Sequence, residues 1–231
     1  MVKVKIIVGG FGSGKSEYAV NLALEWATHP GPKTAIVDLD LVNAYFRIRE
    51  VQQLLEAQQI RCVVPSDTIR FSDMPIAGPG IAALINDGNY QTIIDVGGDE
   101  VGATALGSYR SQLTLAQPEV ELVVNPYRPY TQTVKLIVEM KESIEYCSSI
   151  PINAVVSNPN IGTGTTLEQV LSKHAIVEEA AREMNLPVRE LLVLQELYEN
   201  HSLELNTLGV RIRPLKIYLS PQWLLKQQKE E

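Results

Sequence analysis

Cysteine and histidine are scarce in this chain: its 231 residues include 2 Cys and 3 His. Cys62 and Cys147 stand far apart, with no CxxC pair and no adjacent histidine. Free thiols are therefore expected, not a disulfide or a metal site. The histidines are isolated as well, and each is expected at the surface (His29, His174 and His201). The sequence thus contains no Cys/His metal-binding motif.

Long apolar runs and basic clusters are absent too. No stretch reaches the roughly 20 apolar residues that a membrane-spanning helix needs, so no membrane span is expected. Lys3 and Lys5 interrupt the first apolar run, and no signal peptide is recognisable. The net charge of −7 and the scattered Lys and Arg residues argue against nucleic-acid binding. A soluble, cytoplasmic protein is expected.

The pattern of the remaining sequence predicts an α/β fold. Short apolar runs rich in Val and Ile alternate with stretches of helical periodicity, which is typical of βαβ units and a mostly parallel central sheet with helices on both faces. One domain is expected over residues 1–231, with a frayed, charged tail from about 226 to 231. The predicted strands are Val2–Val8, Thr34–Asp38, Ile60–Val64, Gln91–Val96, Glu119–Asn125, Ile152–Ser157, Glu190–Leu194 and Leu215–Leu219. The predicted helices are Lys15–Thr28, Ala44–Gln59, Thr131–Cys147 and Thr166–Met184, the last with a capping box of Thr165 and Glu168.

Residues 9–16, Gly-Gly-Phe-Gly-Ser-Gly-Lys-Ser, fit the phosphate-loop pattern G-x-x-x-x-G-K-[ST] at every fixed position. They connect the first predicted strand to the first predicted helix, whose N-terminus favours the negative charge of phosphate. Lys15 is expected to contact the β- and γ-phosphates as a catalytic group, and the Ser16 hydroxyl to bind Mg²⁺. The segment predicts a three-layer P-loop NTPase fold. Its predicted nucleotide-binding residues are Gly9, Gly10, Phe11, Gly12, Ser13, Gly14, Lys15, Ser16 and Glu17.

Acidic residues end two further predicted strands, at the edge where a parallel sheet binds its ligand. One strand ends in Asp38-Leu39-Asp40, and another ends in Asp95 followed by Val-Gly-Gly, which has the form of a Walker B segment running into D-x-x-G. Asp40 is the predicted catalytic acid. The backbone N–H of Gly98 is expected to contact the γ-phosphate within a switch segment, 97–104, that exposes Asp99 and Glu100. The predicted metal ligands are Ser16, Asp38, Asp40 and Asp95.

These motifs resemble the MinD/ParA/CobQ-type nucleotide-binding domains of the SIMIBI class of P-loop NTPases, over roughly residues 2–160. The resemblance implies that Asp40 orients the attacking water and that Asp95 supports Mg²⁺. Members that pair across a nucleotide sandwich carry a signature lysine where this chain has Gly10. The segment 95–100 also resembles the acid-G-G-D segment of hydrogenase- and urease-maturation GTPases, whose Cys/His motifs are missing here.

Residues 158–161, Asn-Pro-Asn-Ile, lie where related GTPases carry the N-K-x-D motif that reads guanine. The carboxylate that would pair with guanine is missing, whereas Asn158 offers a donor and an acceptor suited to adenine. Asn158 and Pro159 are therefore predicted to contact the base, with a plain turn as the alternative, and ATP is favoured over GTP. Arg128 is a candidate for contact with base or phosphate, against a solvated surface position. A loop at 195–201 is a further candidate for base contacts.

The leading functional hypothesis is a Mg²⁺-dependent, switch-type ATPase. The alternatives are a small-molecule kinase or ATP-dependent ligase, similar to the CobQ and dethiobiotin-synthetase enzymes, a metallocentre-maturation GTPase, and a nucleotide-sensing module with negligible turnover. Besides nucleotide, the expected partner is a protein or a small-molecule acceptor. The sequence leaves monomer and homodimer open.

Overall fold

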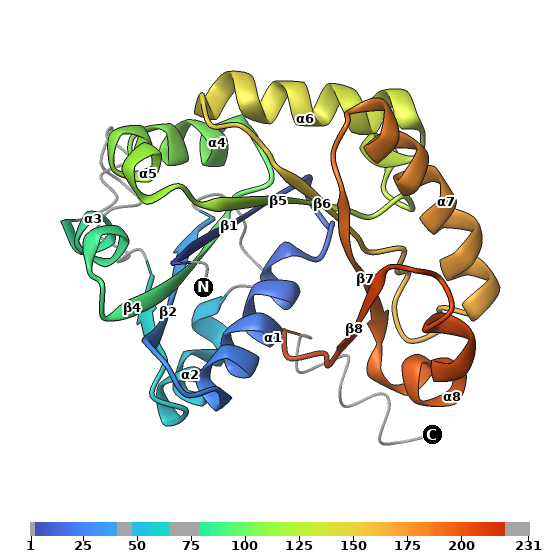
Figure 1. Ribbon diagram of the computed structural model, residues 1–231, viewed down its shortest axis with the longest axis horizontal. Helices are drawn as coiled ribbons and strands as arrows, with labels where there is room; N and C mark the ends of the chain where they lie inside the picture. The colour runs from blue at the N-terminus through green and yellow to red at the C-terminus, as the bar shows by residue number, and fades with distance from the viewer. Residues whose placement is uncertain (1–2, 41–47, 65–78, 220–231) are drawn as a thin grey trace.

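The computed structural model describes residues 3–40, 48–64 and 79–219. Within these ranges eight strands form one sheet in the order β3-β2-β4-β1-β5-β6-β7-β8, and every pair of neighbours is parallel (Figure 1). The predicted α/β fold with a parallel sheet is confirmed. The strands are β1 (Val4–Val8), β2 (Lys33–Leu39), β3 (Arg61–Val63), β4 (Tyr90–Val96), β5 (Glu119–Val124), β6 (Ala154–Ser157), β7 (Val188–Leu194) and β8 (Arg211–Leu215).

Helices cover both faces of the sheet and make the outer layers. Figure 1 shows α1 and α2 on one face, while α3 to α7 lie along the other. Two short 3-10 turns, Ile48–Val51 and Pro129–Thr131, accompany the helices. The helices are α1 (Lys15–Thr28), α2 (Gln52–Ala57), α3 (Pro79–Asn86), α4 (Glu100–Gly107), α5 (Arg110–Ala116), α6 (Val134–Ser148), α7 (Leu167–Glu183) and α8 (Gln195–Leu205).

Successive side chains of each strand point to opposite faces of the sheet, so the core has one part on each face. Ile7, Ile36 and Ile93 pack with α1, whereas Ile6 and Ile94 pack with the helices of the opposite face. All five side chains are fully buried. Because helices cover both faces of the parallel sheet, residues on both sides of each strand are buried, which explains the continuous apolar runs in the sequence.

Several element boundaries differ from the predictions. The prediction of a last strand at Leu215–Leu219 is wrong, because this strand spans Arg211–Leu215. A proline is tolerated there because β8 is the edge strand of the described sheet, where the missing N–H of Pro214 can fall on the side without a neighbouring strand. The capping box of α7 consists of Thr166 and Gln169, one residue later than predicted. The predicted helix Ala44–Gln59 lies partly outside the described residues, and its described part is a 3-10 turn followed by α2.

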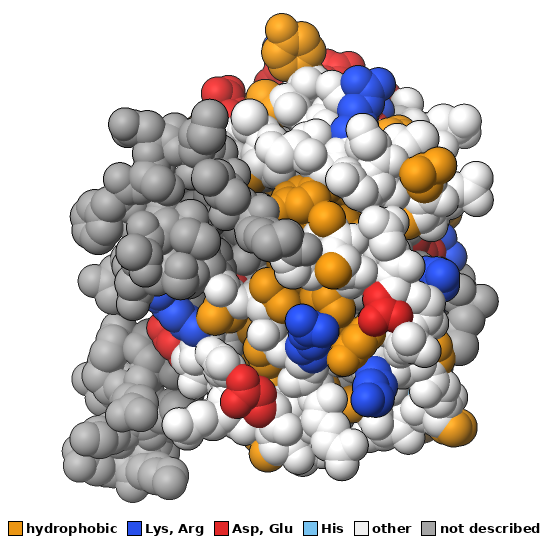
Figure 2. Space-filling view, turned by 90° about the vertical axis from the view of Figure 1, so that its left-hand side faces the viewer, with side chains coloured by type: hydrophobic (Ala, Val, Ile, Leu, Met, Phe, Trp, Pro, Cys, Tyr) orange, Lys and Arg blue, Asp and Glu red, His pale blue; other side chains and the backbone are white. Residues whose placement is uncertain are grey.

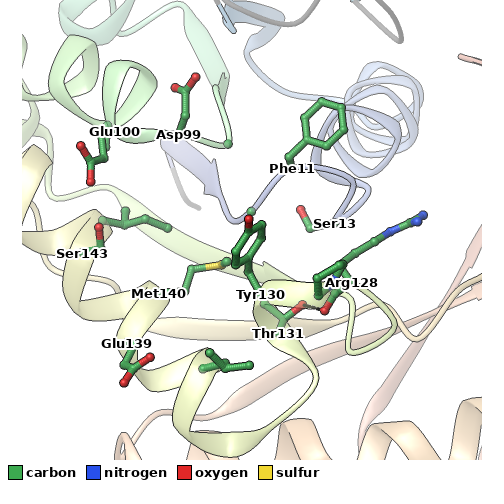
Figure 3. Close-up of a pocket in the computed structure, with 16 residues that line it drawn as sticks. Phe11, Ser13, Asp99, Glu100, Arg128, Tyr130, Thr131, Glu139, Met140 and Ser143 are labelled. Atoms are coloured by element: carbon green, nitrogen blue, oxygen red, sulfur yellow. Dashed lines mark hydrogen bonds between the residues drawn. The ribbon is translucent and has the colours of Figure 1, made fainter.

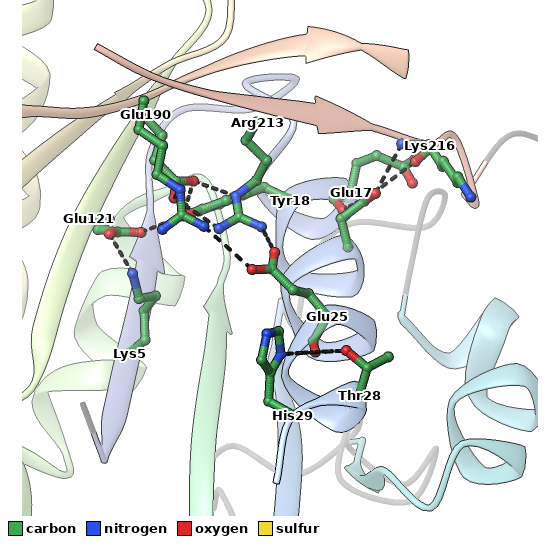
Figure 4. Close-up of polar contacts among 12 residues, drawn as sticks. Lys5, Glu17, Tyr18, Glu25, Thr28, His29, Glu121, Glu190, Arg213 and Lys216 are labelled. Atoms are coloured by element: carbon green, nitrogen blue, oxygen red, sulfur yellow. Dashed lines mark hydrogen bonds and ion pairs between the residues drawn. The ribbon is translucent and has the colours of Figure 1, made fainter. Parts of the chain in front are cut away.

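A network of buried charges lies beneath α1 and joins it to β1, β5, β7 and β8 (Figure 4). Lys5 Nζ lies 2.6 Å from Glu121 Oε1, and the Tyr18 hydroxyl lies 2.9 Å from Glu121 Oε2 and 3.1 Å from Glu190 Oε2. Arg213 donates to Glu190 through Nε and through Nη2, the latter at 2.8 Å. Burial raises the pKa of Glu121 against the opposing charge of Lys5. For Glu190, burial also raises the pKa, but the hydrogen bonds and charge of Arg213, together with the charges of Arg211 and Lys5, outweigh it and hold the pKa below its usual value.

The surface shows little charge clustering. On the face in Figure 2, Lys and Arg side chains are scattered singly among acidic and apolar ones, and no basic patch forms on the part that is described. None of the helices in the described ranges combines the length and the apolar composition that crossing a bilayer requires. Cys62 and Cys147 are both free, as expected.

Candidate nucleotide-binding site

The loop at 9–14 connects β1 to α1 with a backbone path that needs glycine. Gly9, Gly12 and Gly14 have φ values of 144°, 72° and 91°, which side-chain-bearing residues rarely adopt. Space is limiting as well, because a Cβ at Gly14 would lie 2.2 Å from Asn158 Nδ2. The pattern that marked the phosphate loop in the sequence is therefore explained by conformation and by close packing.

Lys15 is the first residue of α1, and its side chain is buried. Its ammonium group donates to the Gly10 carbonyl oxygen at 3.0 Å, across the loop. Burial lowers the pKa of Lys15, and the negative charges of Asp95, Asp40 and Asp99 oppose that shift in decreasing order. The arrangement places one buried cation, with three acids close to it, inside the phosphate loop.

The acids come together because β2 and β4 are neighbours in the sheet. Asp38 and Asp95 are directly paired in the strand register, and Asp38 Oδ1 accepts a hydrogen bond from the Asp40 backbone N–H at 2.9 Å. Both oxygens of Asp95 are buried, and the groups close to them are the Lys15 ammonium group and the Ser16 hydroxyl. Burial raises the pKa of Asp95 to about 7, whereas the charge of Lys15 and a hydrogen bond from Ser16 lower it and the charge of Asp38 raises it. Since a buried carboxylate is costly unless it is paired, a bound cation would add to the pairing that Lys15 and Ser16 provide.

The segment after β4 lies directly against the phosphate loop. A Cβ at Gly98 would be 2.7 Å from the Phe11 backbone nitrogen, and one at Gly97 would be 3.5 Å from Asp40 Oδ1. The second half of the predicted switch segment is helical, because α4 begins at Glu100 and Asp99 caps it by accepting from the Gly102 N–H at 2.8 Å. Asp99 is therefore a helix cap as well as a neighbour of Lys15.

The loop after β6 is fastened to the phosphate loop. Asn158 is buried, its Nδ2 donates to the Ser13 carbonyl oxygen at 2.7 Å, and its Oδ1 has no partner among the described residues. The two Asn-Pro segments are also joined, because Asn125 Nδ2 donates to the Asn160 carbonyl oxygen at 2.7 Å. Asn158 thus has a structural contact that the sequence did not reveal, and its Oδ1 is the acceptor without a partner among the described residues. Pro159 is also buried, directly after it.

Other candidate residues have roles that local sequence could not show. Arg128 Nε donates to the Gly12 carbonyl oxygen at 2.9 Å, which makes it a clamp on the phosphate loop. Glu17 accepts from the backbone N–H groups of Tyr218 and Leu219, at 2.6 and 3.1 Å, so its side chain holds the segment after β8. Because the side chain of Glu17 is held in this way, only its backbone is still predicted to contact the nucleotide.

Two further expectations about this region are wrong. His174 is not at the surface: it is buried in α7, with Nδ1 2.9 Å from Ser157 Oγ. The segment 195–201 is not a loop, because α8 runs from Gln195 to Leu205. The first error concerns tertiary packing, which spacing along the chain does not encode, and the second concerns the secondary structure of the segment.

The donor set fits Mg²⁺ bound together with phosphate. No group of three or more His, Cys, Asp or Glu within the described ranges could hold a metal ion by itself. Mg²⁺ is commonly bound through one or two carboxylates, substrate phosphates and water, which is compatible with the Ser16 hydroxyl and the buried oxygens of Asp95. Metal roles for Ser16, Asp38, Asp40 and Asp95 remain predictions.

The parallel sheet, the phosphate loop between β1 and α1, and the acids at the ends of β2 and β4 define a P-loop NTPase fold. Solved structures share this fold. The cell division protein FtsY of Thermotoga maritima superposes with a TM-score of 0.55 at 17% identity, covering 84% of this chain and 62% of that protein. The signal recognition particle receptor FtsY of Elizabethkingia anophelis, in complex with GDP, gives 0.54 at 18% identity, covering 84% and 58%.

A third similar structure is the signal recognition particle 54 kDa protein of Aeropyrum pernix, also in complex with GDP. It gives a TM-score of 0.54 at 21% identity and covers 80% of this chain and 40% of that protein. The chain thus spans less than two thirds of the length of each of these proteins. No protein-family profile and no curated protein matches the chain.

Proposed function

We propose that this protein is a Mg²⁺-dependent nucleoside triphosphatase of the SIMIBI class that works as a nucleotide-controlled switch. The observation that carries the proposal is the buried Lys15 ammonium group, held by the Gly10 carbonyl oxygen and surrounded by Asp95, Asp40 and Asp99. The similarity in fold to FtsY and the 54 kDa protein, which belong to the SIMIBI class, supports the choice of class. The MinD/ParA/CobQ relationship remains a hypothesis based on the sequence motifs.

Each group has a distinct role in this mechanism. Lys15 exchanges the Gly10 carbonyl oxygen for phosphate oxygens, which keeps its buried charge paired. Asp40 positions the attacking water, and the N–H of Gly98 donates to the γ-phosphate. When bound, Mg²⁺ supplies charge neutralisation for the phosphates, with Ser16, Asp38 and Asp95 as its supporting residues. Because the segment 97–99 lies against the phosphate loop, nucleotide state is expected to move α4.

We infer that the nucleotide is ATP. Asn158 Oδ1 is a buried acceptor without a partner among the described residues, and it suits the N6 amine of adenine. Guanine would bring an N1–H and an amine donor into a segment, 158–161, that has no carboxylate. Each unmatched donor would cost roughly 1–3 kcal/mol, although the two GDP complexes of similar fold keep guanine as the alternative.

Competition titration of ATP against GTP, at the same magnesium and salt concentrations, tests the choice of base. ATP is expected to bind at least ~10-fold more tightly, equivalent to about 1.4 kcal/mol. A preference for GTP would overturn the role of Asn158 and favour the maturation-GTPase resemblance. Turnover measured separately distinguishes a hydrolase from a sensing module, which would keep bound nucleotide intact for hours. One domain over residues 1–231, a cytoplasmic location, a protein partner and a monomer or homodimer stay predictions.

A further inference from the structure

A cavity of about 660 Å³ lies beside the phosphate loop (Figure 3). It is bounded by the phosphate loop and Gly98, by the start of α4, by the 3-10 turn Pro129–Thr131 and by α6. This volume falls within the range of roughly 300–1,000 Å³ that is usual for small-molecule sites. Leu136, Met140 and Ile144 of α6 give it an apolar wall. The nucleotide proposed above does not account for this wall.

The cavity depends on Gly10, the position at which SIMIBI members that pair across a nucleotide sandwich carry a lysine. A Cβ at Gly10 would lie 2.6 Å from Met140 Cε, so any side chain there would displace the methionine. Glycine at this position lets α6 approach the phosphate loop and brings the apolar wall next to the phosphate site. The cavity and the site of the γ-phosphate therefore share the backbone of Gly10.

The polar lining is predominantly acidic. Asp99, Glu100 and Glu139 contribute carboxylates, and Arg128 is the one cationic side chain of the lining. Its Nε is committed to the Gly12 carbonyl oxygen, and Figure 3 shows its guanidinium group extending away from Met140 and Glu139. Asp99 caps α4. Glu139 lies 3.6 Å from Lys135, and both side chains are exposed, so the described lining has a surplus of negative charge.

Two aromatic side chains and one buried hydroxyl complete the lining. Phe11 is 72% exposed and Tyr130 is 75% exposed, which is unusual for large aromatic residues at the border of a cavity. The faces of such rings attract cations. Ser13 also lines the cavity, but its Oγ is buried, and it has no hydrogen-bond partner among the described residues. These features match a molecule with an apolar body and a cationic group.

We propose that this cavity binds a small organic cation, a protonated amine on an apolar chain, as an effector of the nucleotide site. Its apolar chain packs against Met140 and Leu136, and its ammonium group faces the acidic lining to which Glu100 and Glu139 contribute. Binding of a cation in the cavity does not depend on the proposed function. An effect of the cation on nucleotide binding does rest on that function, because Gly10, Phe11 and Gly98 line the cavity and are also predicted to bind the nucleotide.

Three probes of equal length and different charge test the cavity: hexylamine, 1-hexanol and hexanoate. The protein is labelled with ¹³C in its methionine methyl groups, so that Met140 reports on the cavity and Met184, which packs in the core under α7, serves as the internal control. Hexylamine is expected to shift the Met140 signal at millimolar concentration, with an affinity roughly fivefold or more above that of hexanol, the scale of an exposed ion pair. Hexanoate is expected to bind most weakly. No shift at Met140, or equal shifts with all three probes, would overturn the proposal.

Matched variants locate the charge that selects the amine. The double variant Glu100→Gln, Glu139→Gln is expected to lower the hexylamine affinity roughly fivefold and to leave hexanol unchanged. The control is Glu142→Gln, which removes an exposed acid from α6 that does not line the cavity. If the control variant weakens hexylamine as much as the double variant does, the assignment of the carboxylates is wrong.

A second titration, with Mg²⁺ and ATP present, tests the link to the nucleotide site. The added negative charge of the triphosphate is expected to raise the hexylamine affinity several-fold, and by reciprocity hexylamine raises the ATP affinity by the same factor. If calorimetry shows no ATP binding, the proposed function fails, whereas the titration without nucleotide still decides whether the cavity binds cations. If ATP binds and the hexylamine affinity stays the same, the link is overturned.

Discussion

Replacing Gly98 by alanine probes the contact between the switch segment and the phosphate loop. The new methyl group would lie 2.7 Å from the Phe11 nitrogen and 2.9 Å from the Gly10 carbonyl carbon, closer than real Cβ atoms come. Both neighbours are backbone atoms of a constrained loop, so they cannot rotate away as a flexible side chain would. Overpacking of this kind typically costs about 1–3 kcal/mol of unfolding free energy.

Urea unfolding of the nucleotide-free protein measures this cost, with an unchanged m-value as the sign that only stability has changed. The matched control is Gly164→Ala, since a Cβ at Gly164 meets no atom within 4 Å. Its expected effect is within about 0.5 kcal/mol of zero. Turnover of Gly98→Ala is expected to fall by roughly 10²-fold or more, the scale for one displaced donor. If Gly98→Ala is as stable and as active as Gly164→Ala, the segment does not contact the loop as described.

Three further predictions concern other parts of the structure. Arg213→Met removes the two hydrogen bonds that Arg213 donates to the buried Glu190 and leaves it the longer contact of 3.4 Å with the more exposed Arg211, so unfolding measurements should show a loss of about 3 kcal/mol. Burial depresses the pKa of His174, so below about pH 6.5 the unfolded chain binds more protons than the folded one, and the free energy of unfolding should fall as the pH drops. His174→Asn should flatten this part of the pH profile of unfolding. Asp40→Asn should keep most of the nucleotide affinity while slowing turnover by ~10²-fold, and equal turnover would remove Asp40 from the water-positioning role.

The phosphate loop could be predicted because its determinants are local. Backbone conformation requires glycine at Gly9, Gly12 and Gly14, and the helix that starts at Lys15 follows directly in sequence. The acids Asp38 and Asp95 could be placed together for a related reason: parallel strands end at one edge of the sheet, and β2 and β4 are neighbours in it.

The remaining features depend on contacts between distant segments. β8 was misplaced because a charged residue such as Arg213 is not expected in a buried strand, and its burial depends on pairing with Glu190 and Glu25 from distant segments. In the same way, the burial of His174 depends on Ser157, and the side chain of Glu17 is held by a segment about 200 positions away. The apolar cavity beside the loop had no sequence signal, because its wall comes from α6, which is far from the loop in sequence and approaches it where Gly10 has no side chain.

Calorimetric titration of ATP in the presence of Mg²⁺, into the wild-type protein and into Lys15→Ala, tests the nucleotide site itself. The wild type should bind one ATP per chain, and the variant, shown to be folded by circular dichroism, should bind more weakly by about 2–4 kcal/mol, the scale for removing one partner of a buried charge pair. Failure of the wild type to bind any nucleoside triphosphate, or equal affinity in the folded variant, would contradict the assignment of residues 9–16 as a phosphate-binding loop.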